Sequence, residues 1–79
     1  MKTLDSIKVG EKAIIKSLNT KGDMRRRFLD IGLIKGTKVE CVLDSPSGNP
    51  KAYLIRGAVI AIRREDSATI TIEECLHEI

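Results

Sequence analysis

The chain has 79 residues, a length that supports one small domain and leaves no room for a second core. Hydrophobic residues make up 42% of it and charged residues 32%, a balance that is typical of a globular protein and excludes extended disorder. Its net charge of +3 comes from 14 basic and 11 acidic residues that are mostly interspersed. This bias is too mild for a dedicated nucleic-acid-binding protein, which carries a strong patch of one sign.

The cysteine content and the distribution of apolar residues indicate the cellular compartment of the protein. Cys41 and Cys75 are too few for the disulfide framework of a small secreted protein, so reduced thiols are expected. Residues 1–5 contain no long apolar run, which argues against a signal peptide. No segment approaches the roughly 20 apolar residues that span a bilayer. We therefore expect a soluble, cytoplasmic protein that reaches a membrane only through a partner.

The first part of the chain predicts a turn, a strand and a loop. Gly10 follows two spaced apolar residues and is typical of a turn that leads into a strand. Residues 12–18 are rich in β-branched and aliphatic side chains and predict that strand. The Asn-Thr-Lys-Gly sequence at 19–22 is typical of a loop.

One short basic helix is predicted over about residues 22–31. Met24, Phe28 and Ile31 recur at i, i+4 and i+7, so they lie on one helical face, which Leu29 broadens. An isolated helix of this length is unstable in water. Its apolar face must therefore pack on a sheet.

The two ends of this helix carry recognisable signals. The Asp23 carboxylate is expected to cap the first turn. Gly32 is expected to end the helix in a left-handed conformation. With the apolar face turned inward, Arg25 and Arg26 point largely away from the core.

A second strand is predicted over residues 37–44, after a turn at Gly36. Val39, Cys41 and Leu43 alternate with the side chains between them, which is the period of a half-buried strand. We therefore expect these three side chains to share the buried face.

Three further strands are predicted over residues 51–56, 59–63 and 68–73. A loop with two prolines, at 45–50, precedes them, and Gly57 breaks or bulges the chain between the first two. The polar turn at 64–67 is long enough for one turn of 3₁₀ helix. Five short strands and one small helix exclude a βαβ enzyme core. They favour a mainly β fold, a small and partly open barrel of the SH3 or OB kind, formed as a single domain by residues 1–79.

Catalysis is not expected. His77 is the only histidine, and no serine or cysteine lies near it in a nucleophile motif. The sequence has neither a GxxxxGK[ST] phosphate loop nor a GxGxxG turn. We therefore expect neither an enzyme nor a bound cofactor.

Metal binding has one weak set of candidates, namely Cys75 and His77 in the C-terminal tail with Cys41 as a distant third ligand. A structural zinc ion needs four ligands and usually two paired motifs. A free cysteine more commonly packs as a small hydrophobic residue. No metal site is therefore expected.

The arginine run at residues 25–27 has three interpretations. It is a solvated helix face, a nucleic-acid contact, or an interface with an acidic or phosphate-bearing protein, for which the guanidinium fork is suited. Three phosphate contacts would give a salt slope of only about −2.7, which implies weak duplex affinity. Nucleic-acid binding is therefore not expected, and the solvated face and the protein interface stay open.

The helix and the residues after it also carry a family motif. Residues 27–36 have the sequence Arg-Phe-Leu-Asp-Ile-Gly-Leu-Ile-Lys-Gly, close to the pattern R-L-L-D-[LM]-G-[LI]-x-x-G. Phe28 and Ile31 are mild apolar departures. Further matches are Leu4-x-x-Ile7-x-x-Gly10, Asn49-Pro50, Ile55-Arg56-Gly57, and Ile60-Ala61-Ile62-Arg63 with Ala68. Over nearly its whole length the chain resembles the ferrous iron transport protein A family (FeoA).

This resemblance implies a small cytoplasmic SH3-like β-barrel of about five strands with an inserted helix. It implies a partner, the large membrane transporter of ferrous iron with its cytosolic GTP-binding domain, and a role as accessory or regulator of that transporter. It also implies kinship with the SH3-like domain at the C-terminus of iron-dependent repressors. Without a catalytic site, the chain is expected to act through its surfaces, as a monomer or weak oligomer.

The helix and the loop after it are the predicted partner-binding surface. Arg25, Arg26 and Lys35 supply charge, and Leu33 and Ile34 are candidate apolar contacts, with core packing against the first strand as their alternative role. Two other functions stay open: a metal-responsive or metal-carrying module, and a stand-alone regulator-binding domain related to repressors. The residues expected to be structural are Arg27, Asp30, Gly32 and Gly36.

Overall fold

The structure, a computed structural model, describes residues 2–76, with the backbone alone for 74–76. Its elements in chain order are η1 (Leu4–Ser6), β1 (Lys12–Leu18), α1 (Gly22–Asp30), β2 (Lys38–Asp44), β3 (Lys51–Ile55), β4 (Ala58–Ile62), α2 (Arg64–Ser67) and β5 (Ile70–Leu76). The prediction of a mainly β fold with five strands and one inserted helix is confirmed. The short 3₁₀ helix η1 was not predicted, and residues 64–67 form a turn of α-helix where a 3₁₀ turn was expected.

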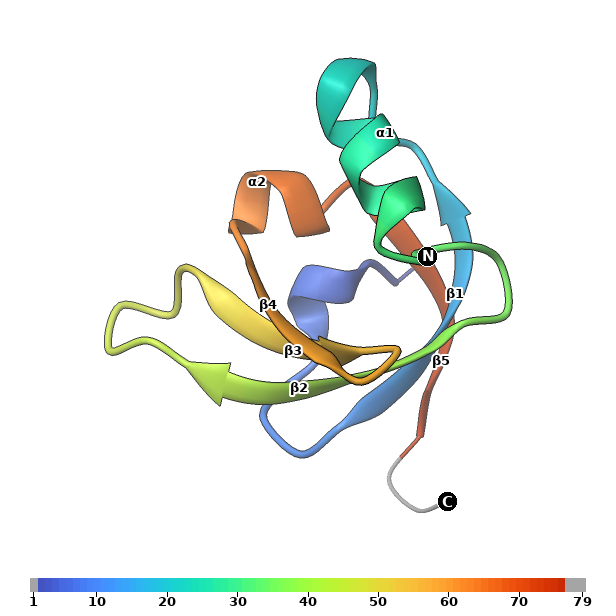
Figure 1. Cartoon of the computed structure of the whole chain (residues 1–79). Coiled ribbons are helices and arrows are strands. Elements are labelled where there is room, and N and C mark those ends of the chain that lie inside the picture. Colours follow the sequence, from blue (N-terminus) through green and yellow to red (C-terminus); the bar gives the residue numbers. More distant parts are fainter. Residues whose placement is uncertain (1, 77–79) are drawn as a thin grey trace.

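The five strands form one antiparallel sheet in the order β4-β3-β2-β1-β5 (Figure 1). The part made of β2, β3 and β4 runs across the lower half of the view, and β1 and β5 rise at its right, so the sheet is strongly bent. Lys2 and Thr3 pair with part of the outer edge of β5. Among residues 2–76, no pairing joins β4 to β5. The ladder is therefore an open, curved sheet.

The core lies on the concave side of the sheet, beneath η1 and α1. Its two aromatic members are Tyr53 and Phe28. The other core residues are aliphatic or small, because the sequence contains few aromatic residues. The other buried hydrophobic residues are Leu4, Ile7, Ala13, Ile15, Leu33, Val39, Cys41, Ile55, Ile62, Ile70 and Ile72.

One prediction about β2 is wrong. Val39 and Cys41 are buried as expected, but the Leu43 side chain is 62% exposed. The pairing of β2 with β3 shifts by one residue between Cys41 and Leu43, so Val42 is an extra residue in the ladder. Such a bulge breaks the two-residue alternation and turns Leu43 to solvent.

The C-terminal end of α1 closes as a Schellman motif. The Leu33 amide donates to the Phe28 carbonyl oxygen at 2.9 Å, and the Gly32 amide donates to the Leu29 carbonyl oxygen at 3.1 Å. Gly32 has a φ of +98°, which confirms its predicted left-handed conformation. Leu33 and Phe28 are both buried, and a hydrophobic contact between these two positions is the usual companion of the motif.

Two details predicted for α1 are wrong. The N-cap residue is Lys21 and it makes no side-chain capping bond, while Asp23 lies within the first turn. There its charge can favour the positive end of the helix dipole without capping it. Leu29 is 42% exposed and does not broaden the buried face.

Gly32 also lies beneath the side chain of Arg56. A Cβ atom built at Gly32 would be 2.1 Å from the Cδ atom of Arg56, so only glycine leaves room for this contact. Arg56 and Gly57 form the two-residue turn between β3 and β4, and both have positive φ, +49° and +88°. Two positive φ values are the signature of a type I′ hairpin turn. The strands that flank the turn were predicted at 51–56 and 59–63. β3 ends one residue earlier than predicted, and β4 begins one residue earlier.

Tyr53 and Lys51 of β3 tie the N-terminal segment to the sheet. The Lys51 ammonium group donates to the carbonyl oxygens of Asp5 and Ile7, at 3.1 and 2.9 Å. The Tyr53 hydroxyl donates to the Leu4 carbonyl oxygen at 3.4 Å. Burial raises the pKa of Tyr53 to about 12, partly opposed by a hydrogen bond with Ser67.

We predict that Gly32→Ala destabilises the fold more than Gly36→Ala does. Both glycines have positive φ, so each substitution costs about 1 kcal/mol in backbone strain. Only the new methyl group at position 32 meets Arg56, since the space around Gly36 is open. Urea unfolding measures both free energies. In an Arg56→Ala background the excess cost at position 32 should vanish. Equal costs in the wild-type background would contradict this account.

A second prediction concerns alkaline pH. The folded chain keeps the Tyr53 proton up to a pKa of about 12, whereas the unfolded chain loses it near 10. The contribution of Tyr53 to stability is therefore constant below about pH 10 and is lost as pH rises towards 12, by roughly 3 kcal/mol in all. Free energies of unfolding measured across this range should decline less steeply for Tyr53→Phe, which shares all other titrating groups. Parallel curves would refute the role assigned to Tyr53.

Candidate partner-binding surfaces

The predicted surface on α1 and its following loop is only partly available. Arg26, Lys35 and Ile34 are exposed, and the side chains of the first two make no hydrogen bond or ion pair within residues 2–76. Arg25 is exposed but engaged, because its Nη1 atom donates to the Leu18 carbonyl oxygen at 2.7 Å. This bond ties α1 to the end of β1. We call Arg26, Ile34 and Lys35 the helix–loop surface.

Leu33 does not belong to this surface. Its side chain is 0% exposed and is part of the hydrophobic core, so the core-packing alternative is correct for Leu33. The neighbouring Ile34 is 49% exposed, so for Ile34 the same alternative is wrong. That Arg25, Arg26, Ile34 and Lys35 contact a partner stays a prediction.

Backbone hydrogen bonds hold the loop after α1 in place. The Gly36 amide donates to the Ile15 carbonyl oxygen at 2.8 Å, and the Ile15 amide donates to the Thr37 carbonyl oxygen at 2.9 Å. The Thr37 hydroxyl donates to the Gly32 carbonyl oxygen at 2.9 Å. Ile34 and Lys35 are therefore presented on a segment fixed to β1.

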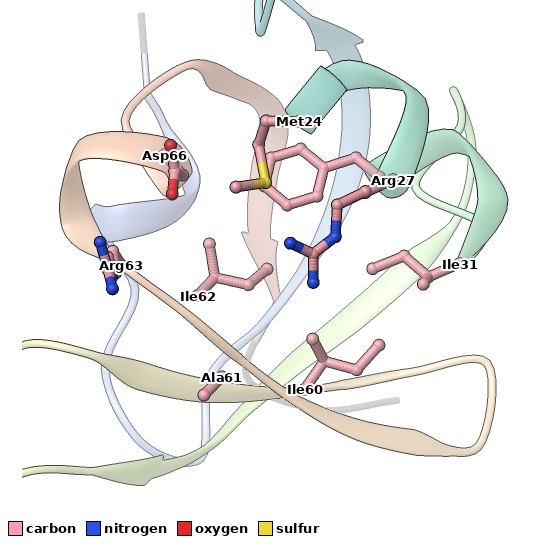
Figure 2. A pocket seen from close by; sticks show the side chains of 9 residues that line it. Met24, Arg27, Ile31, Ile60, Ala61, Ile62, Arg63 and Asp66 are labelled. Carbon is pink, nitrogen blue, oxygen red and sulfur yellow. The ribbon is translucent and has the colours of Figure 1, made fainter. Parts of the chain in front are cut away.

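A second surface, a groove, lies between α1 on one side and β4 with α2 on the other (Figure 2). Its volume is about 380 Å³, which is within the range of small-ligand and side-chain sites. The apolar side chains of Ile60 and Ile62 rise from β4 towards α1. The full lining comprises Met24, Arg27, Phe28, Ile31, Ile60, Ala61, Ile62, Arg63 and Asp66.

Arg27 was expected to be structural, but it is an exposed groove residue. Figure 2 shows its guanidinium group directed from α1 into the groove, above Ile60 and Ile62. Within residues 2–76 the Arg27 and Arg63 side chains make no hydrogen bond or ion pair. Sequence spacing could have placed Arg27 beside Met24 and Ile31, since positions three and four apart share a helical face. Nothing in the sequence around Arg27 indicates that α2 and β4 form the opposite wall of the groove.

The groove has no catalytic constellation. Its ionisable members are two arginines and Asp66, and the lining contains no histidine, cysteine, serine or lysine. Acid–base or nucleophilic catalysis needs a titratable pair in contact, which these residues do not provide.

The weak metal candidates do not form a site in the described part of the chain. Cys41 is 0% exposed, and burial raises the pKa of its thiol, which disfavours the thiolate that binds metals. Cys75 belongs to β5, but its side chain, like the whole of His77, lies outside what the structure describes. Among the described residues, no group of three or more His, Cys, Asp or Glu could hold a metal ion. None of the helices in residues 2–76 is long and apolar enough to cross a membrane.

Solved structures of other proteins have the same fold. The FeoA protein from Chlorobium tepidum is 30% identical to this chain, with a TM-score of 0.84 over 90% of this chain and 68% of that one. The Stenotrophomonas maltophilia FeoA, solved in complex with zinc and described as a prokaryotic SH3 domain protein, is 21% identical, with a TM-score of 0.83. That match covers 92% of this chain and 91% of the other.

The expected kinship with iron-dependent repressors agrees with a likeness in fold to a repressor that depends on another metal, manganese. A manganese-dependent transcriptional repressor has a TM-score of 0.76 and 14% identity, over 87% of this chain and 39% of that one. A sequence identity this low supports a shared fold only.

In sequence, a segment of a longer protein is similar. A Porphyromonas gingivalis protein, named as a fusion of Fe(2+) transport protein A with the Fe(2+) transporter FeoB, is 31% identical over 70 residues. The match covers 89% of this chain but only 8% of the fusion protein. Finally, the family model of the FeoA domain matches residues 2–74. The chain therefore belongs to the FeoA domain family.

Proposed function

We propose that this chain is a non-enzymatic accessory protein of ferrous iron uptake, which acts in the cytoplasm by binding the GTP-binding portion of a membrane ferrous iron transporter. The observation that carries the proposal is the P. gingivalis relative, in which a FeoA segment and the transporter FeoB are one polypeptide. Fusion keeps two parts of a protein at high effective concentration. Where the FeoA domain is a separate chain, a surface of its own must supply that association.

The helix–loop surface has the composition such an association requires. In the described part of the chain, the Arg26 and Lys35 side chains have no hydrogen-bond or ion-pair partner, and Ile34 is an exposed apolar side chain next to Lys35 in sequence. Arginine together with exposed apolar area is characteristic of protein interfaces. The bond from Arg25 to Leu18 and the backbone bonds of Gly36 and Thr37 fix the segments that present them, so little backbone entropy is lost on binding.

We predict that Arg26→Glu combined with Lys35→Glu weakens binding to the isolated cytosolic domain of the transporter at least tenfold, which is about 1.4 kcal/mol. Reversing both charges places like charges against an acidic partner surface. Biolayer interferometry with and without GTP measures the affinity. Lys8→Glu is the control for a charge reversal at a remote site, because Lys8 is also exposed and lies in the η1–β1 connection, at the opposite end of the molecule from α1 in Figure 1.

If the double variant binds as tightly as the wild-type chain, the interface lies on another surface. The absence of binding to the domain in both nucleotide states would overturn the proposal itself.

A metal-carrying role is the second candidate, because the similar S. maltophilia FeoA was solved with zinc. The burial of Cys41 opposes this role for that thiol. Cys75 and His77 would then be the ligands. Purified protein dialysed with zinc or ferrous iron at neutral pH should retain metal in proportion to protein, and Cys75→Ala should remove it. Near-zero occupancy of the wild-type chain would eliminate this candidate.

A further inference from the structure

The outer edge of β4 is unusual among the surfaces of this chain. β4 is the terminal strand of the sheet and pairs with β3 along one side only. Its sequence, Ala-Val-Ile-Ala-Ile, contains no charged or polar residue. Natural edge strands are normally blunted by charges, prolines or bulges, because an open apolar edge is a template for another strand. β4 has none of these features, and its register with β3 is unbroken over all five residues.

The hairpin turn determines which backbone groups face outward. In a two-residue turn the flanking residues, Ile55 and Ala58, form a hydrogen-bonded pair. The alternation that follows places the amide and carbonyl groups of Val59 and Ala61 on the side away from β3. Among residues 2–76, no turn, loop or cap hydrogen bond involves either of these two residues. The edge therefore offers two donors and two acceptors at the spacing of an antiparallel ladder.

The groove continues this edge towards α1. Side chains of an added strand alternate between the two faces of the sheet. Those on the inner face would lie beside Ile60 and Ile62, in the groove of about 380 Å³ beneath α1. Those on the outer face would lie beside Val59, which is 57% exposed. Apolar side chains near the centre of the added strand would therefore pack well on both faces of the sheet.

The charges around the edge favour an acidic occupant. Arg56 precedes β4, Arg63 and Arg64 follow it, and Arg27 is directed into the groove. Of these, Arg27 and Arg63 make no side-chain hydrogen bond or ion pair in the described chain, and Asp66 is the one acidic residue of the groove lining. Arginine binds carboxylates through paired donors.

The same charges oppose pairing of β4 with a second copy of this chain. The antiparallel register that pairs all five residues of β4 with those of another copy is centred on Ile60. It would bring the hairpin turn of each copy, with Arg56, near the other end of β4 in the second copy, which Arg63 and Arg64 follow. Like charges brought close together repel each other, which opposes this pairing.

We propose that β4 binds an extended acidic segment of a partner protein as a sixth strand, with its inner apolar side chains in the groove. Strand addition of this kind draws affinity from backbone bonds and specificity from alternate side chains. This surface differs from the helix–loop surface and can be tested without the transporter.

The probe is a synthetic peptide of alternating valine and threonine between terminal glutamates, acetylated and amidated at its ends. Titrated into ¹⁵N-labelled protein, it should shift the amide resonances of Val59 and Ala61 and slow their hydrogen exchange. The same peptide with lysine in place of glutamate should bind at least tenfold more weakly, as should the glutamate peptide to Arg27→Glu. Lys8→Glu and the Arg26→Glu, Lys35→Glu double variant should bind it normally.

Ala61→Pro removes one outward amide without touching the β3 ladder, so the fold should persist and binding should fall at least tenfold. If that variant does not fold, a peptide N-methylated at the residues that face β4 removes the bonds that the peptide donates to the outward carbonyl oxygens of Val59 and Ala61, and binding should again fall at least tenfold. Binding that survives methylation, equal affinity for the lysine peptide, or shifts confined to other strands would overturn the proposal. Concentration-dependent self-association through β4 without peptide would assign the edge to a second copy instead and equally refute it.

Discussion

Helix α1 has nine residues, and a helix of that length does not persist in water unless another element buries its apolar face. Phe28 is its one buried member, and the Schellman motif joins Phe28 to Leu33, which is buried as well. These two core side chains anchor the helix at its C-terminal end. The groove, the loop after α1 and the orientation of its arginines all depend on that anchorage.

The other residues of the helix are less buried and make other contacts: Met24 packs against the core from its edge, and Arg25 donates to the Leu18 carbonyl oxygen. Met24 and Arg27 face the groove, whereas Arg26 faces solvent. A single helix therefore contributes to two distinct surfaces, one on each side. Membership of the FeoA domain family, and the fusion of one relative to FeoB, agree with a protein that works by binding.

Features with a local cause could be predicted from the sequence. The helix at about 22–31 follows from apolar spacing and from Gly32, and the strands follow from β-branched runs between turn residues. Features that depend on pairing could not. Leu43 alternates correctly in sequence, yet a bulge opposite β3 exposes it. Arg27 is a charged residue, and its type alone suggests a side chain in solvent. Only the placement of β4 and α2 across from α1 makes it a groove residue. The open edge of β4 likewise follows from strand order, which no residue of β4 encodes.

The contact between Arg56 and Gly32 has a mechanical consequence for the groove. It joins the tip of the β3–β4 hairpin to the end of α1, and thus the two walls of the groove at the end where Ile31 and Ile60 lie. At the other end, near Met24 and Asp66, no hydrogen bond joins α1 to α2 within residues 2–76. In the described part of the chain, the two walls of the groove are therefore in contact at the hairpin tip and are not joined by a hydrogen bond beside α2.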